Sequence, residues 1–155
     1  MDRRELLGVL GTGAVGLATL SARSAHAAEQ GHGGHAHTDC MKACSECMNE
    51  CNETFNHCIA QLELGKKDHS QAAHLTADCA AICGLSATLV GRESPLLAFS
   101  CQACAEACQV CASECEKLDS AKMKQCARAC RDCEKACRNM LTAVREHSGG
   151  AAARP

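Results

Sequence analysis

The sequence predicts an all-α protein, an antiparallel up-down-up-down four-helix bundle with a cysteine-lined core. Cysteines recur at alternating intervals of three and four residues, which places them on one face of an α-helix because the helix turns once per 3.6 residues. Four segments of helical character are joined by short turns, as in antiparallel bundles. No stretch shows the alternating period of a β-strand, so no sheet competes with this interpretation.

The composition limits the function classes. The 155 residues include 16 cysteines and two phenylalanines but neither tryptophan nor tyrosine, so alanine, leucine and cysteine must fill the core. The length fits a single domain. The formal net charge of −2 gives no basic footprint for nucleic acid.

The N-terminal residues 1–27 have the features of an export signal. Arg3 and Arg4 precede a weakly apolar, glycine-rich run, and Ala25-His26-Ala27 is a small-x-small cleavage site. A twin-arginine signal fits best and predicts an exported, periplasmic protein, with an ordinary secretory leader as the alternative. Beyond the signal, no apolar run predicts a membrane span in the mature chain.

The first two helices follow a flexible arm. Residues 28–37 are rich in glycine and histidine and cannot bury enough surface to become ordered. The bundle is expected over residues 38–147, and its first helix begins at a capping threonine or aspartate and stops at Gly65. The second helix begins at a capping box formed by Asp68 and Gln71, and it runs to residue 91.

The last two helices have equally clear starts. Ser94-Pro95 pairs a capping serine with proline at the first helical position, and this third helix extends to about residue 118. Asp119 or Ser120 opens the fourth helix. It reaches about residue 147, where a Gly-Gly pair ends it and a disordered tail, 148–155, follows.

The cysteine stripes are the candidate functional site. Thiolates are soft ligands that select Cu(I), Zn(II) or iron–sulfur clusters. Zinc requires a closed tetrahedron, and several four-thiolate sites would concentrate negative charge in a narrow core. Iron–sulfur sites use short loop intervals near proline. Cu(I) is monovalent and accepts two or three sulfurs, so shared thiolates leave little net charge, and the pattern predicts many Cu(I) ions per chain. The predicted ligands are Cys40, Cys44, Cys47, Cys51, Cys58, Cys79, Cys83, Cys101, Cys104, Cys108, Cys111, Cys115, Cys126, Cys130, Cys133 and Cys137.

Other interpretations of the cysteines remain open. Neighbours on one helix lie about 5–6 Å apart at Cβ, beyond the roughly 3.5–4.5 Å of a disulfide, but bridges between helices could staple a structural or redox-buffering bundle. Cys101 and Cys111 are spaced along the sequence like the paired cysteines of disulfide-bridged twin-cysteine helical hairpins. General sequestration of zinc and other soft metals is a further alternative. Cysteine as mere core filler is disfavoured, because leucine would bury more apolar area.

An enzyme is not predicted. A catalytic cysteine needs a positioned base and a lowered pKa, whereas a periodic array contains no privileged thiol. A di-iron bundle needs inward Glu-x-x-His pairs, and neither His57 nor His74 has a glutamate three residues before it.

The repeated C-x-x-x-C and C-x-x-C motifs resemble those of the copper storage proteins, four-helix bundles whose cysteines hold many Cu(I) ions inside. The resemblance covers the whole mature chain, and the leader looks like that of exported members from methane-oxidising bacteria, although this sequence has more cysteines than such members lead us to expect. The resemblance implies a tetramer of bundles and delivery of copper to copper-accepting enzymes such as membrane methane monooxygenase.

The same resemblance implies that copper loads through a mouth at one open end, lined by histidine and methionine. Carried onto this sequence, the mouth residues are His37, Met41 and Met48, which flank the cysteine stripe near the start of the first helix. Two alternatives stay open. The methionines could be packing residues or face another subunit, and apolar residues at that end could plug it: Leu89, Leu96, Phe99 and Val144.

Overall fold

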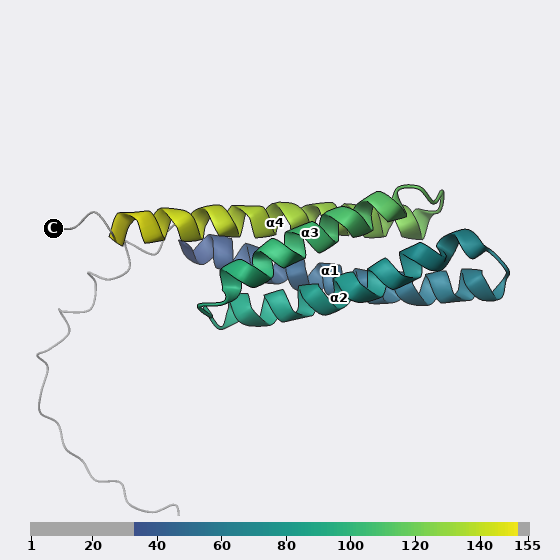
Figure 1. Cartoon of the computed structure of the whole chain (residues 1–155), viewed down its shortest axis with the longest axis horizontal. Coiled ribbons are helices and arrows are strands. Elements are labelled where there is room, and N and C mark those ends of the chain that lie inside the picture. Colours follow the sequence, from purple (N-terminus) through teal and green to yellow (C-terminus); the bar gives the residue numbers. More distant parts are fainter. Residues whose placement is uncertain (1–32, 152–155) are drawn as a thin grey trace, which may run out of the picture. The chain divides into compact units, whose positions relative to one another are not determined.

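Four long helices make up residues 33–151, the part of the chain that the computed structural model describes, with side chains described for residues 35–147. Each helix packs against its two neighbours around one core, and successive helices run in opposite directions (Figure 1). The predicted four-helix bundle with a cysteine-lined core is confirmed. The predicted export signal, 1–27, and residues 28–32 of the predicted arm lie outside the described residues. The helices are α1 (Gly33–Glu63), α2 (Ser70–Gly91), α3 (Leu97–Cys115) and α4 (Ala121–Ala151), and a short 3-10 helix, η1 (Lys67–His69), precedes α2.

Gly65 terminates α1, as the sequence predicts. Its φ of 81° is the left-handed conformation that favours glycine. The Gly65 N–H donates to the Leu62 carbonyl at 2.9 Å, and the Lys66 N–H donates to the Gln61 carbonyl at 3.0 Å. These two bonds form a Schellman motif, which satisfies carbonyls that the end of a helix leaves free.

Glu93 terminates α2 by the same motif but without a glycine. The Glu93 N–H donates to the Val90 carbonyl at 2.9 Å, and the Ser94 N–H donates to the Leu89 carbonyl at 3.0 Å. Glu93 has a φ of 49°, so a residue with a Cβ occupies the left-handed position.

Replacing Glu93 by glycine should therefore stabilise the apoprotein. Relief of the left-handed strain, offset in part by greater freedom of the unfolded chain, should raise the free energy of unfolding by about 0.5–1 kcal/mol in urea denaturation. The matched control is Arg92→Gly, because Arg92 has an ordinary φ of −96° and gains nothing from glycine. Equal effects of the two substitutions would contradict this account.

The predicted helix starts are partly correct. The Ser120 hydroxyl accepts a hydrogen bond from the Met123 N–H at 3.2 Å, which confirms this cap of α4. The Ser94 hydroxyl accepts from the Leu96 N–H at 3.2 Å, but it caps a turn, and α3 begins only at Leu97.

The predicted capping box of α2 is wrong. The side chain of Asp68 contacts Nδ1 of His69 at 2.9 Å, and His69 occupies the N-cap position without a side-chain cap. The η1 turn draws the Asp68 carboxylate towards the imidazole, so it does not cap the free amides of α2.

Two helices are longer than predicted. α1 begins at Gly33, five residues before the predicted cap, and α4 continues through the Gly-Gly pair to Ala151. Ala36 and Val144 are half-buried and pack against the core. Each glycine inside a helix costs about 1 kcal/mol relative to alanine. Packing of side chains such as these against the core offsets that cost and lets the helices extend.

Among the described residues, one segment, Lys67–Gly91, is long and apolar enough to cross a membrane by length and composition. This segment packs between α1 and α3. Its Cys79 and Cys83 side chains are buried in the bundle core. The core helix of a bundle produces the same apolar signal.

Candidate metal centre

Every cysteine side chain is buried in the bundle. Their exposed fractions are 0% except for Cys79 at 1%, and all sixteen are free thiols. Because intervals of three and four residues keep a stripe on one side of a helix, each helix presents its cysteines to the same interior. α1, α3 and α4 supply most of the sulfurs, and α2 supplies two.

The sulfurs meet on the axis of the bundle. Cys47 on α1 and Cys108 on α3 lie 3.9 Å apart at Sγ, although these two helices are not neighbours. Cys83 on α2 and Cys133 on α4 approach to 4.0 Å across the other diagonal. Contacts across both diagonals require the sulfurs to reach the centre.

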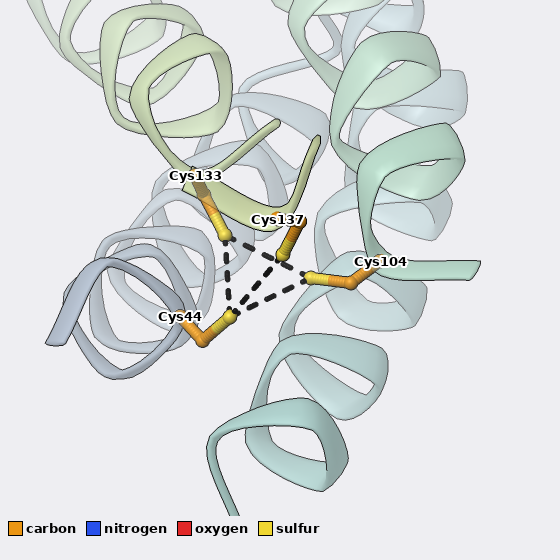
Figure 2. Close-up of side chains that lie close together, drawn as sticks. All are labelled: Cys44, Cys104, Cys133 and Cys137. Carbon is orange, nitrogen blue, oxygen red and sulfur yellow. Dashed lines mark hydrogen bonds between the residues drawn. The ribbon is translucent and has the colours of Figure 1, made fainter. Parts of the chain in front are cut away.

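One group of four shows the local geometry (Figure 2). Cys44 Sγ lies 3.5 Å from Cys137 Sγ, 3.7 Å from Cys133 Sγ and 3.9 Å from Cys104 Sγ. Three helices supply these thiols, and all point towards one another. Sulfurs bonded to one ion at roughly 2.3 Å, the zinc–thiolate length, would be roughly 4 Å apart in a trigonal site. The apoprotein thus already holds its sulfurs at metal-binding separations.

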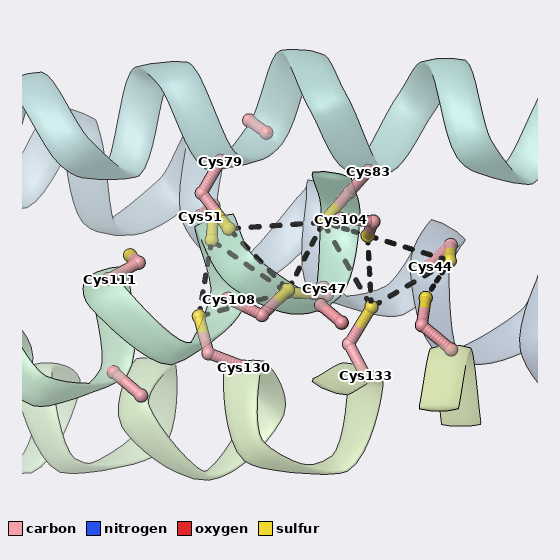
Figure 3. Close-up of a cluster of buried hydrophobic side chains, with 14 of the residues drawn as sticks. Cys44, Cys47, Cys51, Cys79, Cys83, Cys104, Cys108, Cys111, Cys130 and Cys133 are labelled. Atoms are coloured by element: carbon pink, nitrogen blue, oxygen red, sulfur yellow. Dashed lines mark hydrogen bonds between the residues drawn. The ribbon is translucent and has the colours of Figure 1, made fainter. Parts of the chain in front are cut away.

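Further groups of this kind follow one another along the bundle and share members (Figure 3). In each group, the sulfurs lie within 4.8 Å of one another. Sharing turns separate groups into one continuous thiol column, the name used below for the sixteen cysteines. The other groups are Cys40-Cys101-Cys137, Cys47-Cys83-Cys108-Cys133, Cys47-Cys51-Cys79-Cys130 and Cys51-Cys111-Cys126-Cys130.

Ionisation is shared along the thiol column. Hydrogen bonds with Cys111 and other thiols raise the pKa of Cys51, whereas hydrogen bonds with Cys108 and other thiols lower the pKa of Cys47. A thiolate is stabilised where its neighbours donate S–H groups, and a thiol is stabilised where it is the donor. Neighbouring thiols of the column therefore differ in how readily they lose a proton.

Cys58 gives the reduced apoprotein a predictable pH dependence. Burial, followed by the neighbouring Cys126 and Cys111 charges, raises the pKa of Cys58 from 9.0 to about 11. A raised pKa stabilises the fold below pH 9, and this contribution is lost as pH rises towards 11. Anaerobic urea denaturation should show a loss of roughly 3 kcal/mol from this group. A Cys58→Ser variant should lose less stability over the same interval, and equal losses in both proteins would contradict the assignment.

The predicted mouth residues do not form one site. His37 and Met41 line the same hollow of about 290 Å³, beside Val90 and Gly91. Met48 lies elsewhere, with its Sδ against Gly84 of α2. The structure therefore brings together two of the three residues.

Apolar side chains close the bundle at this end. Val90, Leu97 and Met140 are at most 8% exposed and belong to the core. Leu96 and Phe99, two of the residues predicted as a plug, instead face solvent at 56% and 76% exposure. Val144, another residue named for the plug, is half-buried and packs against the core. The residues that are buried most deeply here are therefore not the leucines named from the sequence but Val90, Leu97 and Met140.

The opposite end carries a constellation that sequence reasoning missed. His57 and His69 line a hollow of about 290 Å³, and their ring centroids lie 5.9 Å apart. Nε2 of His57 is buried without a hydrogen-bond partner. Cys58, the next residue along α1, has its Sγ 3.9 Å from Met123 Sδ. The sequence signal was His57 directly before the last cysteine of the α1 stripe, but the partners come from η1 and α4.

Both imidazoles can bind a metal ion. Burial and the nearby His69, Lys122 and Lys66 charges lower the pKa of His57, so its ring is neutral at pH 7. The contact from His69 Nδ1 to the Asp68 carboxylate favours the proton on Nδ1 and leaves Nε2 for a ligand. Imidazole and thioether bind Cu(I) less firmly than thiolate, which suits exchange.

Along the axis of this helical bundle, neighbouring groups of cysteine sulfurs share members. This arrangement is that of a protein that binds several soft metal ions side by side. Residues 34–142 match the family model described as copper storage protein. The chain therefore belongs to the copper storage protein family.

Solved structures agree with this assignment. The Cu(I)-bound copper storage protein BsCsp3 is 34% identical, over 68% of this chain and 98% of that chain, with a TM-score of 0.62. Apo copper storage protein 3 from Bacillus subtilis is 35% identical, over 67% and 97% of the two chains, with a TM-score of 0.60. A copper storage protein from Streptomyces lividans loaded with 10 copper equivalents is 26% identical, over 78% and 95%, with a TM-score of 0.67. A comparison with curated proteins finds no match.

The family and the thiol groups together define the function. The chain is a copper storage protein that binds multiple Cu(I) ions through cysteines inside a four-helix bundle, and it is not an enzyme.

Proposed function

We propose that all sixteen cysteines are the Cu(I) ligands and that the thiol column fills with about one ion per cysteine, on the order of a dozen or more per chain. The supporting observation is that shared, sulfur-only groups run along the axis, with Cys58 and Cys115 as the thiols outside the five groups. Each two-coordinate ion releases up to two thiol protons, and sharing a thiolate between ions keeps the buried charge near zero.

Disulfides and zinc fit the column less well. The sixteen thiols are free, with neighbouring sulfurs 3.5–4.0 Å apart in contacts such as Cys83 with Cys104 and with Cys133. Four of the groups have the four thiolates that zinc takes, but neighbouring groups share them, so closed tetrahedra could not all form. Competition of a Cu(I) chelator and a zinc chelator for the loaded protein tests this choice.

We propose that copper loads where α1 ends. His57 and His69 would receive the ion from the hollow, and Cys58 with Met123 would pass it to the column. The ligands become softer and more buried along this path. His37 and Met41 are the second candidate, supported by their common hollow, although the buried Val90 lies beside it.

A His57→Ala substitution should slow loading without reducing the final copper content. Removing one transfer ligand should lower the initial rate of Cu(I) uptake from a weak donor roughly tenfold. Stopped-flow competition with a Cu(I) chelator measures this rate. The matched control is His74→Ala, because His74 is an exposed histidine of α2 that does not line the hollow. Slow loading in His37→Ala but not in His57→Ala would move the mouth to the other end.

We further propose that residues 1–27 are a twin-arginine signal and that the mature protein works in the periplasm. The support is the Arg3-Arg4 pair and the cleavage-site pattern. A similar copper storage protein from Streptomyces lividans is described as cytosolic. Export of this chain would therefore mean that the two proteins work in different compartments. Cell fractionation with an Arg3→Lys, Arg4→Lys variant decides, because twin-arginine export should stop.

A homo-oligomer, a tetramer according to the family resemblance, and a copper-accepting enzyme as recipient are also proposed. Large apolar side chains are exposed on the outer faces of α1 and α2, including Ile59 at 38% and Leu85 at 55%, and an assembly would cover them. Light scattering of the purified protein measures the oligomeric state.

A further inference from the structure

Two methionine side chains of α1 pack against glycines of α2. A Cβ built on Gly84 would lie only 2.9 Å from Met48 Sδ, and one built on Gly91 would lie 3.0 Å from Met41 Sδ. Both pairs are seven residues apart along each helix, so they repeat one packing register. Each thioether occupies the space that a side chain on α2 would need, and this packing sets how closely α1 approaches α2.

Among the methionines in the described part of the chain, these two are the ones that solvent can reach. Met123 and Met140 are 0% and 1% exposed, whereas Met41 is 39% exposed and Met48 is half-buried. Oxidation of methionine follows access to the sulfur. A dissolved oxidant should therefore attack the α1–α2 contact before it attacks the methionines of the core.

The Met48–Gly84 contact borders the thiol column directly. Cys47 precedes Met48 on α1, and Cys83 precedes Gly84 on α2. Cys47 and Cys83 belong to the same group, together with Cys108 and Cys133, so separating α1 from α2 here pulls that group apart.

We propose that Met48, with Met41 as a second site, is an oxidative modification site whose sulfoxide loosens α1 from α2 and releases stored Cu(I). The reagent class is a two-electron oxygen donor such as hypochlorous acid. A sulfur–oxygen bond forms and the oxygen–chlorine bond breaks. Sulfur loses two electrons, chlorine leaves as chloride, and the proton is released to water. The new oxygen is a strong acceptor in an apolar contact that offers little space for it.

This inference rests on the proposed thiol column, and the test separates the two. Copper in the full-length protein is first measured by metal analysis, and failure to load overturns the column. The loaded protein then receives about two equivalents of hypochlorite, and peptide mass mapping locates each added oxygen. Transfer of copper to a Cu(I) chelator is timed before and after oxidation.

The oxidised protein should release copper roughly ten- to a hundredfold faster, because the added oxygen does not fit the tight contact with Gly84 and must turn towards water, which separates α1 from α2. Met48→Leu should remove most of this acceleration, whereas Met140→Leu, which changes a buried methionine, should keep it. Treatment with methionine sulfoxide reductases should restore slow release. Slow release of copper from a protein that carries the Met48 sulfoxide would overturn the inference. Equally fast release from the oxidised Met48→Leu variant would also overturn it, because the release would then result from thiol oxidation.

Discussion

Replacing Cys44, Cys104, Cys133 and Cys137 together by serine should lower the copper content by about four Cu(I) ions per chain. Serine keeps the size of the side chain but supplies no soft donor. These thiols form one group within 4.8 Å, so their removal interrupts the column near its closed end. Anaerobic titration with Cu(I), followed by metal analysis, measures the loss.

The control for this variant must show that the bundle still folds. The helical circular dichroism of the variant should match that of the wild type, since buried hydroxyls already occur at Thr54 and Thr76 at 0% exposure. Folding can be rescued by the smaller change Cys104→Ser with Cys133→Ser, for which about two ions should be lost. An unchanged copper content in a folded variant would contradict the assignment of these ligands.

Removing copper from the loaded protein should lower its melting temperature by tens of degrees. A ligand that binds the folded state stabilises it by about 4 kcal/mol per site at a thousandfold excess over the dissociation constant, and the column contains many sites. Binding of copper to thiols of the unfolded chain reduces this gain. Scanning calorimetry of the apo and loaded forms, under anaerobic conditions, measures the difference.

The core offers a structural reason for this large effect. Cysteine buries little apolar area compared with leucine, and the fully buried large side chains of the core are few, among them Val90, Met123 and Met140. The apoprotein therefore depends on packing of small side chains. Equal melting temperatures for the two forms would contradict a core that copper completes.

The fold and the facing of the cysteines were predictable because both depend on local periodicity. The interval of three and four residues fixes one stripe per helix, and short connections fix antiparallel neighbours, so the cysteine-lined bundle follows without tertiary information. Gly65 and Ser120 were predictable for the same reason, since their roles depend on the local backbone.

The ends of the bundle were harder to predict because they depend on contacts between distant segments. Asp68 could cap α2 by sequence, but its carboxylate contacts His69 instead. His57 lies beside His69 of η1, and Cys58 contacts Met123 of α4, which no local sequence pattern indicates. Met48, the predicted mouth residue that lies away from the other two, packs against a glycine of another helix.

The most direct test of the central claim is an anaerobic titration of the fully reduced protein with Cu(I) in the presence of a competing Cu(I) chelator. Thiols are counted after unfolding, and bound copper is counted by metal analysis. A column of shared thiolates predicts that nearly all 16 thiols are free. It also predicts that on the order of a dozen or more Cu(I) ions bind tightly to each chain. Saturation at a few ions, or a freshly purified protein with most thiols already oxidised, would contradict it.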